Sequence, residues 1–351
     1  MRLLILTSRA DCLGENDVLI SNAFRRFGWE VIFGEINAIA ADDYRYFTQG
    51  VTVQGSGEPR HVSSAAQETL SVYFFDECQL IWANSEPHSS VARDVWQMLW
   101  LASQHTAFVN SIEGMMLLNT KHALGYLVPK NNRAYSYASN DFSLLSDRYQ
   151  QSPDQWWVAK PPNASCGQNV FLLPPNGPNV RTILQCLTGN AFGEIGFRPL
   201  PEQEFRTVIQ RQPRHGLSGF KAEYAILQQF IPEVAQGEKR VIVVCGQATA
   251  WHGRKRRADD HRSNIAQGGK AIPVDLHSGE IELAELIGQK LMEHGINFVG
   301  IDLAYPYVME VNIADPGGLY DAQLASGIDR SDKVAELIID HFQKSHSPNE
   351  V

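Results

Sequence analysis

The chain has 351 residues, of which 44% are hydrophobic and 20% are charged, and its formal net charge at pH 7 is −9. This is the composition of a globular protein with room for two or three subdomains, and the negative charge argues against nucleic-acid binding, which needs many cations. The five cysteines lack CxxC spacing, and no apolar run approaches the roughly 20 residues that cross a bilayer. We therefore expect a cytoplasmic protein without a membrane anchor.

Short apolar runs alternate with helical patterns in the first third of the chain, which predicts a parallel α/β sheet. The predicted strands are Leu3–Thr7, Glu30–Phe33, Leu80–Ala83 and Phe108–Val109, the predicted helices are Val18–Phe27 and Val91–Ser103, and the polar segment Gln49–Gln67 is interpreted as a long loop. We expect residues 1–110 to form a Rossmann-like domain. No GxGxxG follows the first strand, so dinucleotide binding is not inferred.

Two further units are expected, at residues 111–222 and 223–351. The second has a predicted helix at Ile112–Leu124, predicted strands at Trp156–Lys160 and Val170–Leu173, and an irregular excursion at Thr188–Gly219. The third has predicted strands at Tyr224–Phe230 and Arg240–Val244 and predicted helices at Ile281–His294 and Lys333–Gln343.

The segment Gly295–Gly318 holds two apolar strand patterns with three polar side chains among them. The strand patterns are Phe298–Leu303 and Tyr307–Val311, and the polar side chains are Asp302, Glu310 and Asn312. Side chains two residues apart on a strand share a face, and an Asp on a neighbouring antiparallel strand can join them. Three hard oxygen donors that leave room for water and phosphate oxygens suit Mg²⁺. The alternative is a hairpin whose polar residues face solvent.

Several motifs occur in an order that resembles the ATP-grasp ligases, and specifically bacterial glutathione synthetase. They are WWVAKP, LQQFIPEVAQGEKRVIVV, RSNIAQGGKA, GINFVGIDL and MEVN. The resemblance covers most of the chain from about Ser111 onward. It implies an α/β ATP-grasp fold preceded by a Rossmann-like (pre-ATP-grasp) domain. The central subdomain would carry a phosphate-covering loop, and the C-terminal subdomain a Mg²⁺ site and a lid loop at Lys255–Lys270.

The resemblance also implies roles for individual residues. The nucleotide would be bound by Lys121 and Lys160 at its phosphates, by Ser165 and Gly167 in the covering loop, by Gln228, Gln229, Phe230 and Ile231 at adenine, and by Glu238 at the ribose hydroxyls. Catalytic charge compensation would come from Arg240, Arg254, Arg262 and Asn264, and the metal ligands would be Asp302, Glu310 and Asn312. Arg suits this role because its planar fork binds oxyanions in bidentate fashion.

Three segments depart from the family pattern, and all three are expected near the substrates. The loop after Lys160 keeps only Gly167 of the usual glycines, with Cys166 interpreted as a spectator thiol, and the excursion at Thr188–Gly219 is long. After Asn312 the chain runs Ile313-Ala314-Asp315-Pro316-Gly317-Gly318. Asp315 would favour a cationic amine or would cap a helix near Leu319. Substrate contacts are expected at Asp315, Gly317, Gly318, Gly268 and Gly269.

The implied reaction is ATP-dependent formation of an amide from a carboxylate and an amine through an acyl phosphate, as in glutathione synthesis. The cofactors would be ATP and Mg²⁺, with two ions expected and Mn²⁺ an alternative, and the partners would be a small acid and a small amine. One alternative is a ligase for another pair, in peptide-like metabolite synthesis or glutamyl tailing. Another is a non-catalytic nucleotide-binding module. The resemblance suggests a homodimer or homotetramer.

Overall fold

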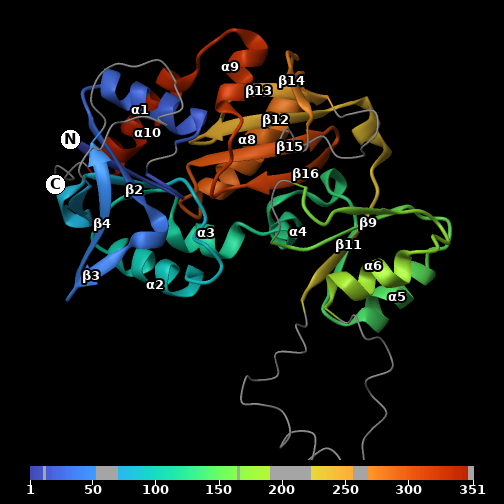
Figure 1. The fold of residues 1–351 in the computed structure, drawn as a ribbon. Coiled ribbons are helices and arrows are strands. Elements are labelled where there is room, and N and C mark those ends of the chain that lie inside the picture. The colour runs from blue at the N-terminus through green and yellow to red at the C-terminus, as the bar shows by residue number, and fades with distance from the viewer. Residues whose placement is uncertain (11–12, 53–69, 164–166, 190–222, 256–267, 347–351) are drawn as a thin grey trace, which may run out of the picture. The chain divides into compact units, whose positions relative to one another are not determined.

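The computed structural model describes residues 1–10, 13–52, 70–163, 167–189, 223–255 and 268–346 (Figure 1). The chain divides into two compact units: residues 1–133, 233–256 and 269–351 form the first, and residues 134–232 and 257–268 form the second. The three-part division at residues 110 and 222 stays a prediction. Among the described residues, no helix combines the length and the apolar character needed to cross a membrane.

The N-terminal sheet of the first unit has a parallel centre, as the alternating pattern predicts. Its strands run in the order β3-β4-β2-β1-β6-β7, with β5 paired to β4; β1, β2, β6 and β7 are parallel, and β3, β4 and β5 join antiparallel. The strands are β1 Arg2–Thr7, β2 Glu30–Glu35, β3 Ala40–Asp42, β4 Arg45–Thr52, β5 Ser71–Phe74, β6 Leu80–Ala83 and β7 Phe108–Val109. The helices along this sheet are α1 Glu15–Arg26 and α2 Ala92–Ala102.

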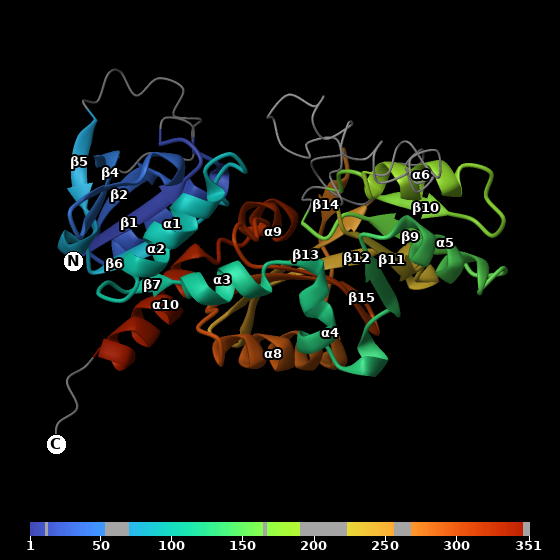
Figure 2. The same cartoon turned by 90° about the horizontal axis from the view of Figure 1, so that it is seen from below.

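The C-terminal sheet of the first unit is antiparallel and carries most of the predicted site. Its order is β14-β13-β12-β15-β16, formed by β12 Glu238–Val244, β13 Gln247–Lys255, β14 Lys270–Ile272, β15 Phe298–Ala304 and β16 Tyr307–Asn312. The helices of this part are α3 Ile112–Leu118, α4 Leu124–Leu127, α8 Ser278–Met292, α9 Leu319–Ser326 and α10 Ser331–His346. Helices α8 and α9 cover opposite faces of the sheet (Figure 2).

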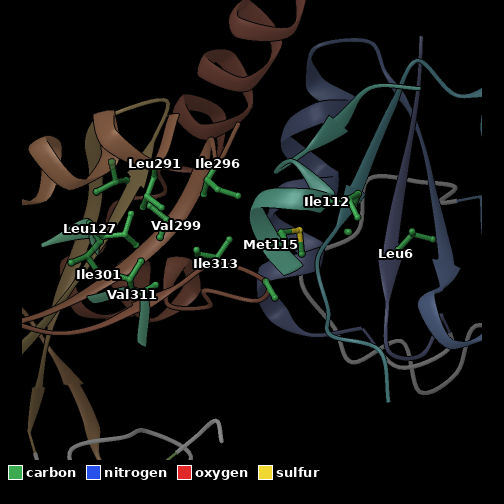
Figure 3. Packing of buried hydrophobic residues seen from close by; sticks show 14 of the residues in the cluster. Leu6, Ile112, Met115, Leu127, Leu291, Ile296, Val299, Ile301, Val311 and Ile313 are labelled. Carbon is green, nitrogen blue, oxygen red and sulfur yellow. The ribbon is translucent and has the colours of Figure 1, made fainter. Parts of the chain in front are cut away.

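Strand alternation explains how this sheet builds two cores from one set of strands. Odd-numbered residues of β12 and β15, such as Val241 and Ile301, pack with Leu291 of α8 and Leu127 of α4 (Figure 3). Ile242 and Val244 point to the other face and pack with α9, α10 and α1. The remaining even-numbered positions of these strands are free to carry polar side chains.

The second unit is a smaller antiparallel sheet covered by two helices. The strand order is β10-β9-β11-β8, formed by β8 Ser136–Ser139, β9 Trp157–Lys160, β10 Phe171–Leu173 and β11 Ala225–Gln229, and the helices are α5 Phe142–Gln150 and α6 Val180–Leu187. Trp157, Ala159 and Leu227 face the helices and form the core with Leu145 and Leu184. Lys160 and Gln228 alternate with these residues and therefore lie on the other face.

Most predicted elements are present with ends shifted by one to three residues, but two predictions are wrong. The helix expected at Ile112–Leu124 ends at Leu118, because Asn119 and Thr120 leave the helical path before the 3₁₀ turn Lys121–Ala123. The loop expected at Gln49–Gln67 begins as strand β4, while residues 53–69 lie outside the described part. The excursion at Thr188–Gly219 also lies outside it, apart from Thr188 and Gly189.

The sequence reasoning missed several elements, among them β13, which supplies two residues of the site. A two-residue turn, Cys245-Gly246, joins β12 to β13, and both residues have positive φ, 46° and 75°. Such turns match the twist of antiparallel strands, and Asn-Gly is their usual sequence signal. Because a cysteine occupies the first position, the hairpin lacked that signal.

Candidate functional site

One face of the C-terminal sheet concentrates charged side chains from four adjacent strands. Arg240 of β12 lies opposite His252 of β13 on one side and opposite Asp302 of β15 on the other, and Asp302 in turn lies opposite Glu310 of β16. Glu238, Arg254 and Asn312 occupy neighbouring positions on the same face. Asp302 is therefore the acidic residue on a neighbouring antiparallel strand that the sequence predicted beside Glu310 and Asn312.

Asp302 is the centre of this network, with only 2% of its surface exposed. Its carboxylate accepts two hydrogen bonds from Arg240, from Nε and from Nη2 at 2.8 Å, and others from Arg254 Nη1 at 3.2 Å and Asn312 Nδ2 at 3.3 Å. Burial opposes ionisation of this carboxyl, but the charges of Arg240 and Arg254 outweigh it and hold its pKa below the usual value. Asp302 is thus an ionised group.

The two residues supplied by β13 are buried beside Asp302. Arg254 donates to Glu238 at 2.8 Å as well as to Asp302, yet its Nε has no hydrogen-bond partner among the described residues. The buried His252 lies beside these groups, and its ring interacts with the backbone of Gly318. Burial, reinforced by Arg254 and Arg240, lowers the pKa of His252 to about 3, so the ring is neutral. An unused guanidinium N–H next to a neutral imidazole favours an anionic ligand.

Lys121 reaches the same sheet from the 3₁₀ turn that interrupts the predicted helix. Its Nζ lies 3.0 Å from Glu310 Oε1, with the lysine side chain 10% exposed and the glutamate 27%. The break at Asn119 has a visible cause, since the Asn119 side chain donates to Glu86 and accepts from the backbone N–H of Ile313. Asn119 therefore links the start of the turn that carries Lys121 to the chain after β16.

In the second unit, the nearly buried Lys160 has a neutral partner. Its Nζ donates to Gln228 Oε1 at 2.9 Å, and Gln228 Nε2 donates to Ser136 Oγ at 3.0 Å. Strands β9 and β11 place Lys160 opposite Ile226, two residues from Gln228. This contact positions the ammonium group with an amide oxygen.

The segment predicted to contact adenine lies at the end of β11. The backbone N–H of Gln229 donates to Tyr135 at 2.8 Å, and that of Phe230 donates to Trp156 at 2.9 Å. These two donors are therefore engaged within the second unit, while Ile231 is buried. Adenine contacts by this segment stay a prediction.

The other predicted loop residues are only partly within the described chain. Ser165, Arg262 and Asn264, together with Cys166, lie outside it, so their roles stay predictions. Gly167, in the predicted covering loop, has φ of 70°, and Gly268 has φ of 87°. Both values lie in the left-handed region that glycine adopts without strain, whereas Gly269 is not recorded there.

The chain after β16 contacts two residues of the network around Asp302, Arg240 and His252. Pro316 accepts a hydrogen bond from Arg240 Nη1 through its carbonyl oxygen. Gly318 has φ of 82°, and a Cβ at this position would meet Arg240 Cγ and His252 Cε1, each at 3.1 Å. Helix α9 begins at Leu319 with Gly318 as its N-cap and no side-chain cap. The alternative role of Asp315 as the helix cap is therefore wrong, and glycine at 318 lets the loop approach the site.

The predicted metal ligands have the donor chemistry that Mg²⁺ requires. Asp302 and Glu310 supply carboxylate oxygens and Asn312 an amide oxygen, which are hard donors of the type that Mg²⁺ prefers. Among the described residues there is no group of three or more His, Cys, Asp or Glu side chains placed to hold a metal ion. The donor set thus fits a metal shared with nucleotide phosphates, which would also supply oxygens, and the arginines now hold the oxygens of Asp302.

Comparisons with known proteins show a family of similar sequences. Residues 215–326 match the family model described as prokaryotic glutathione synthetase, ATP-grasp domain. The glutathione synthetase of Gloeobacter violaceus is 24% identical over 339 residues, which cover 95% of this chain and 94% of that protein. The glutathione synthetase of Bradyrhizobium diazoefficiens is 39% identical over 113 residues, or 32% of this chain and 36% of that protein.

A solved structure extends the likeness to nearly the whole fold. The D-cycloserine synthetase DcsG superposes with a TM-score of 0.62 over 97% of this chain and 100% of that one, at 13% sequence identity. At such an identity the similarity concerns the fold alone. Together these comparisons place the chain in the ATP-grasp fold near the prokaryotic glutathione synthetases, and they support an ATP-dependent carboxylate–amine ligase that uses a divalent metal ion.

Proposed function

We propose that the protein joins the carboxylate of a small acid to an amine, with ATP converted to ADP and phosphate. In the first step a carboxylate oxygen attacks the γ-phosphorus and the bond to the β-phosphate oxygen breaks, giving an acyl phosphate and ADP. In the second step the amine nitrogen attacks the acyl carbon, phosphate leaves, and the nitrogen loses a proton. Both steps need positioned charge more than a side-chain nucleophile.

The observation that carries this proposal is the alternation of cations and carboxylates on one face of β12, β13, β15 and β16. Lys121, Arg240 and Arg254 are pre-positioned by ion pairs with Glu310, Asp302 and Glu238. A phosphoryl group entering this face would meet cations whose geometry is already fixed, so little reorganisation is needed as charge develops. Arg254 Nε, which has no hydrogen-bond partner in the described part of the chain, is a donor suited to such an oxyanion.

The remaining residue roles follow from the same proposal. Lys160 and Lys121 would bind ATP phosphates, Glu238 the ribose, and Asp302, Glu310 and Asn312 the metal. A bound Mg²⁺ would neutralise phosphate charge in both steps. Two ions, or Mn²⁺ in place of Mg²⁺, belong to this proposal, as do a cytoplasmic location and a homodimer or homotetramer. Light scattering on the purified protein tests the oligomeric state.

Phosphate release tests the reaction. With ATP, Mg²⁺ and a panel of acids and amines, we expect release that depends on both an acid and an amine. ATP binding without amine-dependent turnover for any panel member would instead favour a non-catalytic nucleotide-binding module.

The first pair to test is γ-glutamylcysteine with glycine, because glutathione synthetases are the relatives with the matching domain. Formation of glutathione, measured by mass spectrometry, would assign the substrates. If another pair reacts and this one does not, the reaction class stands and a different acid or amine is assigned.

A further inference from the structure

A cavity of about 770 Å³ lies in the first unit along β7, the last strand of the N-terminal sheet. Its wall combines the start of β6, the C-terminal end of α2, the start of α3, the turn before β15 and the last turns of α10. We call it the β7 cavity. None of the described residues that line it belongs to the network around Asp302 or to the residues proposed to bind ATP. A cavity of this size is in the range that accommodates a small organic ligand.

Hydrogen bonds hold the wall of the β7 cavity in place. The backbone N–H of Ser111 donates to Gly295 at 2.8 Å and so joins the start of α3 to the turn before β15. Asn110, which follows the lining residue Val109, is 1% exposed, and its Oδ1 accepts from the backbone N–H of Asn297 at 2.8 Å. Because the wall is fixed by the protein itself, binding requires little ordering of the chain.

Three aromatic side chains line the β7 cavity. Phe108 of β7 and Phe342 of α10 are partly buried, whereas Trp100, near the end of α2, is 42% exposed. Phe108 packs edge-on against Phe75 with 6.5 Å between ring centroids, and Phe342 packs in the same way against Trp29 at 5.9 Å. These neighbours orient the two phenyl rings, while the Trp100 ring keeps surface open to a ligand. Such a wall suits a flat aromatic ring.

The charges that line the β7 cavity are negative. The acidic residues are Asp76 and Glu113, and there is no Lys or Arg among the described lining residues. Asp76 is paired with Arg45 at 2.8 Å, whereas the exposed Glu113 forms no ion pair within the described part of the chain. The only other basic side chains of this wall, His105 and His341, are not permanent cations. The wall is therefore unfavourable for an anion such as a nucleotide.

The C-terminal end of α2 adds partial negative charge to the same wall. Ser103, the C-cap residue, and Gln104 line the cavity, and the last turn of α2 contains no basic residue. Carbonyl groups at a helix C-terminus attract cations. The positive N-terminal end of α3 also lines the cavity, but Glu113 lies in its first turn, and Ser111 Oγ accepts from the N–H of Gly114 at 3.2 Å. The helix ends together thus favour a cationic ligand.

We propose that the β7 cavity binds a protonated aromatic amine, at a site separate from the one proposed for ATP. The ring of the ligand lies against Trp100, Phe108 and Phe342, and its ammonium group lies toward Glu113 and the C-terminal end of α2. An exposed tryptophan also attracts an ammonium group through its ring face. This site goes beyond the proposed ligase reaction and does not depend on it.

Calorimetric titration of the full-length protein with three probes that share an indole ring tests the proposal. Tryptamine carries an ammonium group, tryptophol replaces it with a hydroxyl, and indole-3-acetate carries a carboxylate. We expect tryptamine to bind about five-fold more tightly than tryptophol, because a cation–π contact and an exposed ion pair each contribute modestly, and indole-3-acetate to bind most weakly. Absence of saturable tryptamine binding, or equal affinities for tryptamine and tryptophol, would overturn the proposal.

Two variants with matched controls locate the binding. Trp100→Ala should weaken tryptamine binding by about ten-fold or more, whereas Leu101→Ala, which truncates the next exposed side chain of α2, should bind like the wild type. Glu113→Gln should remove the preference for tryptamine over tryptophol. Asp94→Asn, which removes an exposed carboxylate from the first turn of α2, should keep it. All four side chains are exposed, so folding should be retained, as circular dichroism checks. Unchanged tryptamine binding by Trp100→Ala would contradict the assignment of the cavity.

A non-hydrolysable ATP analogue with Mg²⁺ distinguishes the β7 cavity from the proposed ligase site. At saturation, the analogue should leave tryptamine binding saturable and its stoichiometry unchanged, because the two sites share no lining residue. Displacement of tryptamine by the analogue would place tryptamine in the nucleotide site and reject the proposal. Failure of the analogue to bind, with tryptamine binding intact, would count against the proposed ligase function alone.

Discussion

The two units hold their cationic side chains by different means. In the first unit Arg240 and Arg254 share the buried carboxylate of Asp302, so their charges are balanced within the protein. In the second unit Lys160 is positioned by the neutral amide of Gln228, which in turn bonds to Ser136. The buried carboxylate that balances the two arginines is also one of the proposed metal ligands of the first unit.

Asp302→Asn should produce the largest change, because it removes the charge shared by two buried arginines. We expect a loss of about 3–5 kcal/mol in the free energy of unfolding, together with loss of turnover, since uncompensated buried charges are strongly unfavourable. Denaturant unfolding followed by circular dichroism measures the stability. Asp76→Asn is the matched control, because Asp76 pairs with Arg45 on the surface and should cost no more than about 1 kcal/mol. Equal effects of the two variants would contradict a special role for burial.

Glu310→Gln should separate metal chemistry from folding. Gln keeps the shape of the side chain and removes the charge that faces Lys121, and Glu310 is more exposed than Asp302. We expect Mg²⁺-dependent turnover to fall by about 100-fold or more, with a change in unfolding free energy below about 1 kcal/mol. Steady-state kinetics at several Mg²⁺ concentrations provide the measurement. Near-normal turnover would show that Glu310 is not a metal ligand.

Lys160→Met tests the hydrogen bond between Lys160 and the neutral side chain of Gln228. The substitution leaves Gln228 Oε1 without its donor and should lower the unfolding free energy by about 1–3 kcal/mol, while the KM for ATP rises. Adding Gln228→Leu removes the unsatisfied acceptor, so part of the stability should return while ATP binding stays weak. If the double variant loses more unfolding free energy than the two single variants together, Lys160 and Gln228 do not stabilise each other and this interpretation of the contact is wrong.

The smallest expected effect is the pH dependence contributed by Asp315. Its pKa is raised to about 6 in the folded protein from an ordinary value near 3.8, so the folded chain binds more protons than the unfolded chain between these values. The stability of the wild type should therefore fall as pH rises from about 4 to about 6. Because Asp315 keeps exposed surface, water screens it and the change is smaller than the full shift would give.

Thermal unfolding across this pH range measures the effect. Asp315→Asn should show a shallower decline than the wild type, whereas Asp94→Asn should follow the wild type. An unchanged slope in Asp315→Asn would mean that the carboxyl group titrates normally.

The sequence predicted which polar side chains the strands bring to the site. Alternation alone placed Glu310 and Asn312 on one face and called for an antiparallel Asp, and the structure has Asp302 opposite Glu310. Apolar runs likewise located β1, β6, β7 and β15 within a residue of their ends. The first result follows from the period of two of a strand, and the second from continuous apolar runs, which are typical of strands buried on both faces.

Other features depended on residues that are distant in sequence. No local pattern indicates that Asn119 ends a helix to bond Glu86 and Ile313, or that Cys245 takes a positive φ in a hairpin turn. His252 was missed because β13 was missed. Strand alternation does not mark β13, since Thr249 and Gly253 are buried as well as Ala250, His252 and Arg254.

The sequence by itself determined which residue types lie on which strand and in what order the motifs occur, because these follow from side-chain alternation and spacing. It also offered two roles for Asp315, contact with a cationic amine and, as the commoner role, capping of the helix near Leu319. The tertiary structure excluded the second by giving the cap position to Gly318, while the first stays a prediction. Which residue caps a helix depends on the backbone conformation at its first turn, which the fold alone sets.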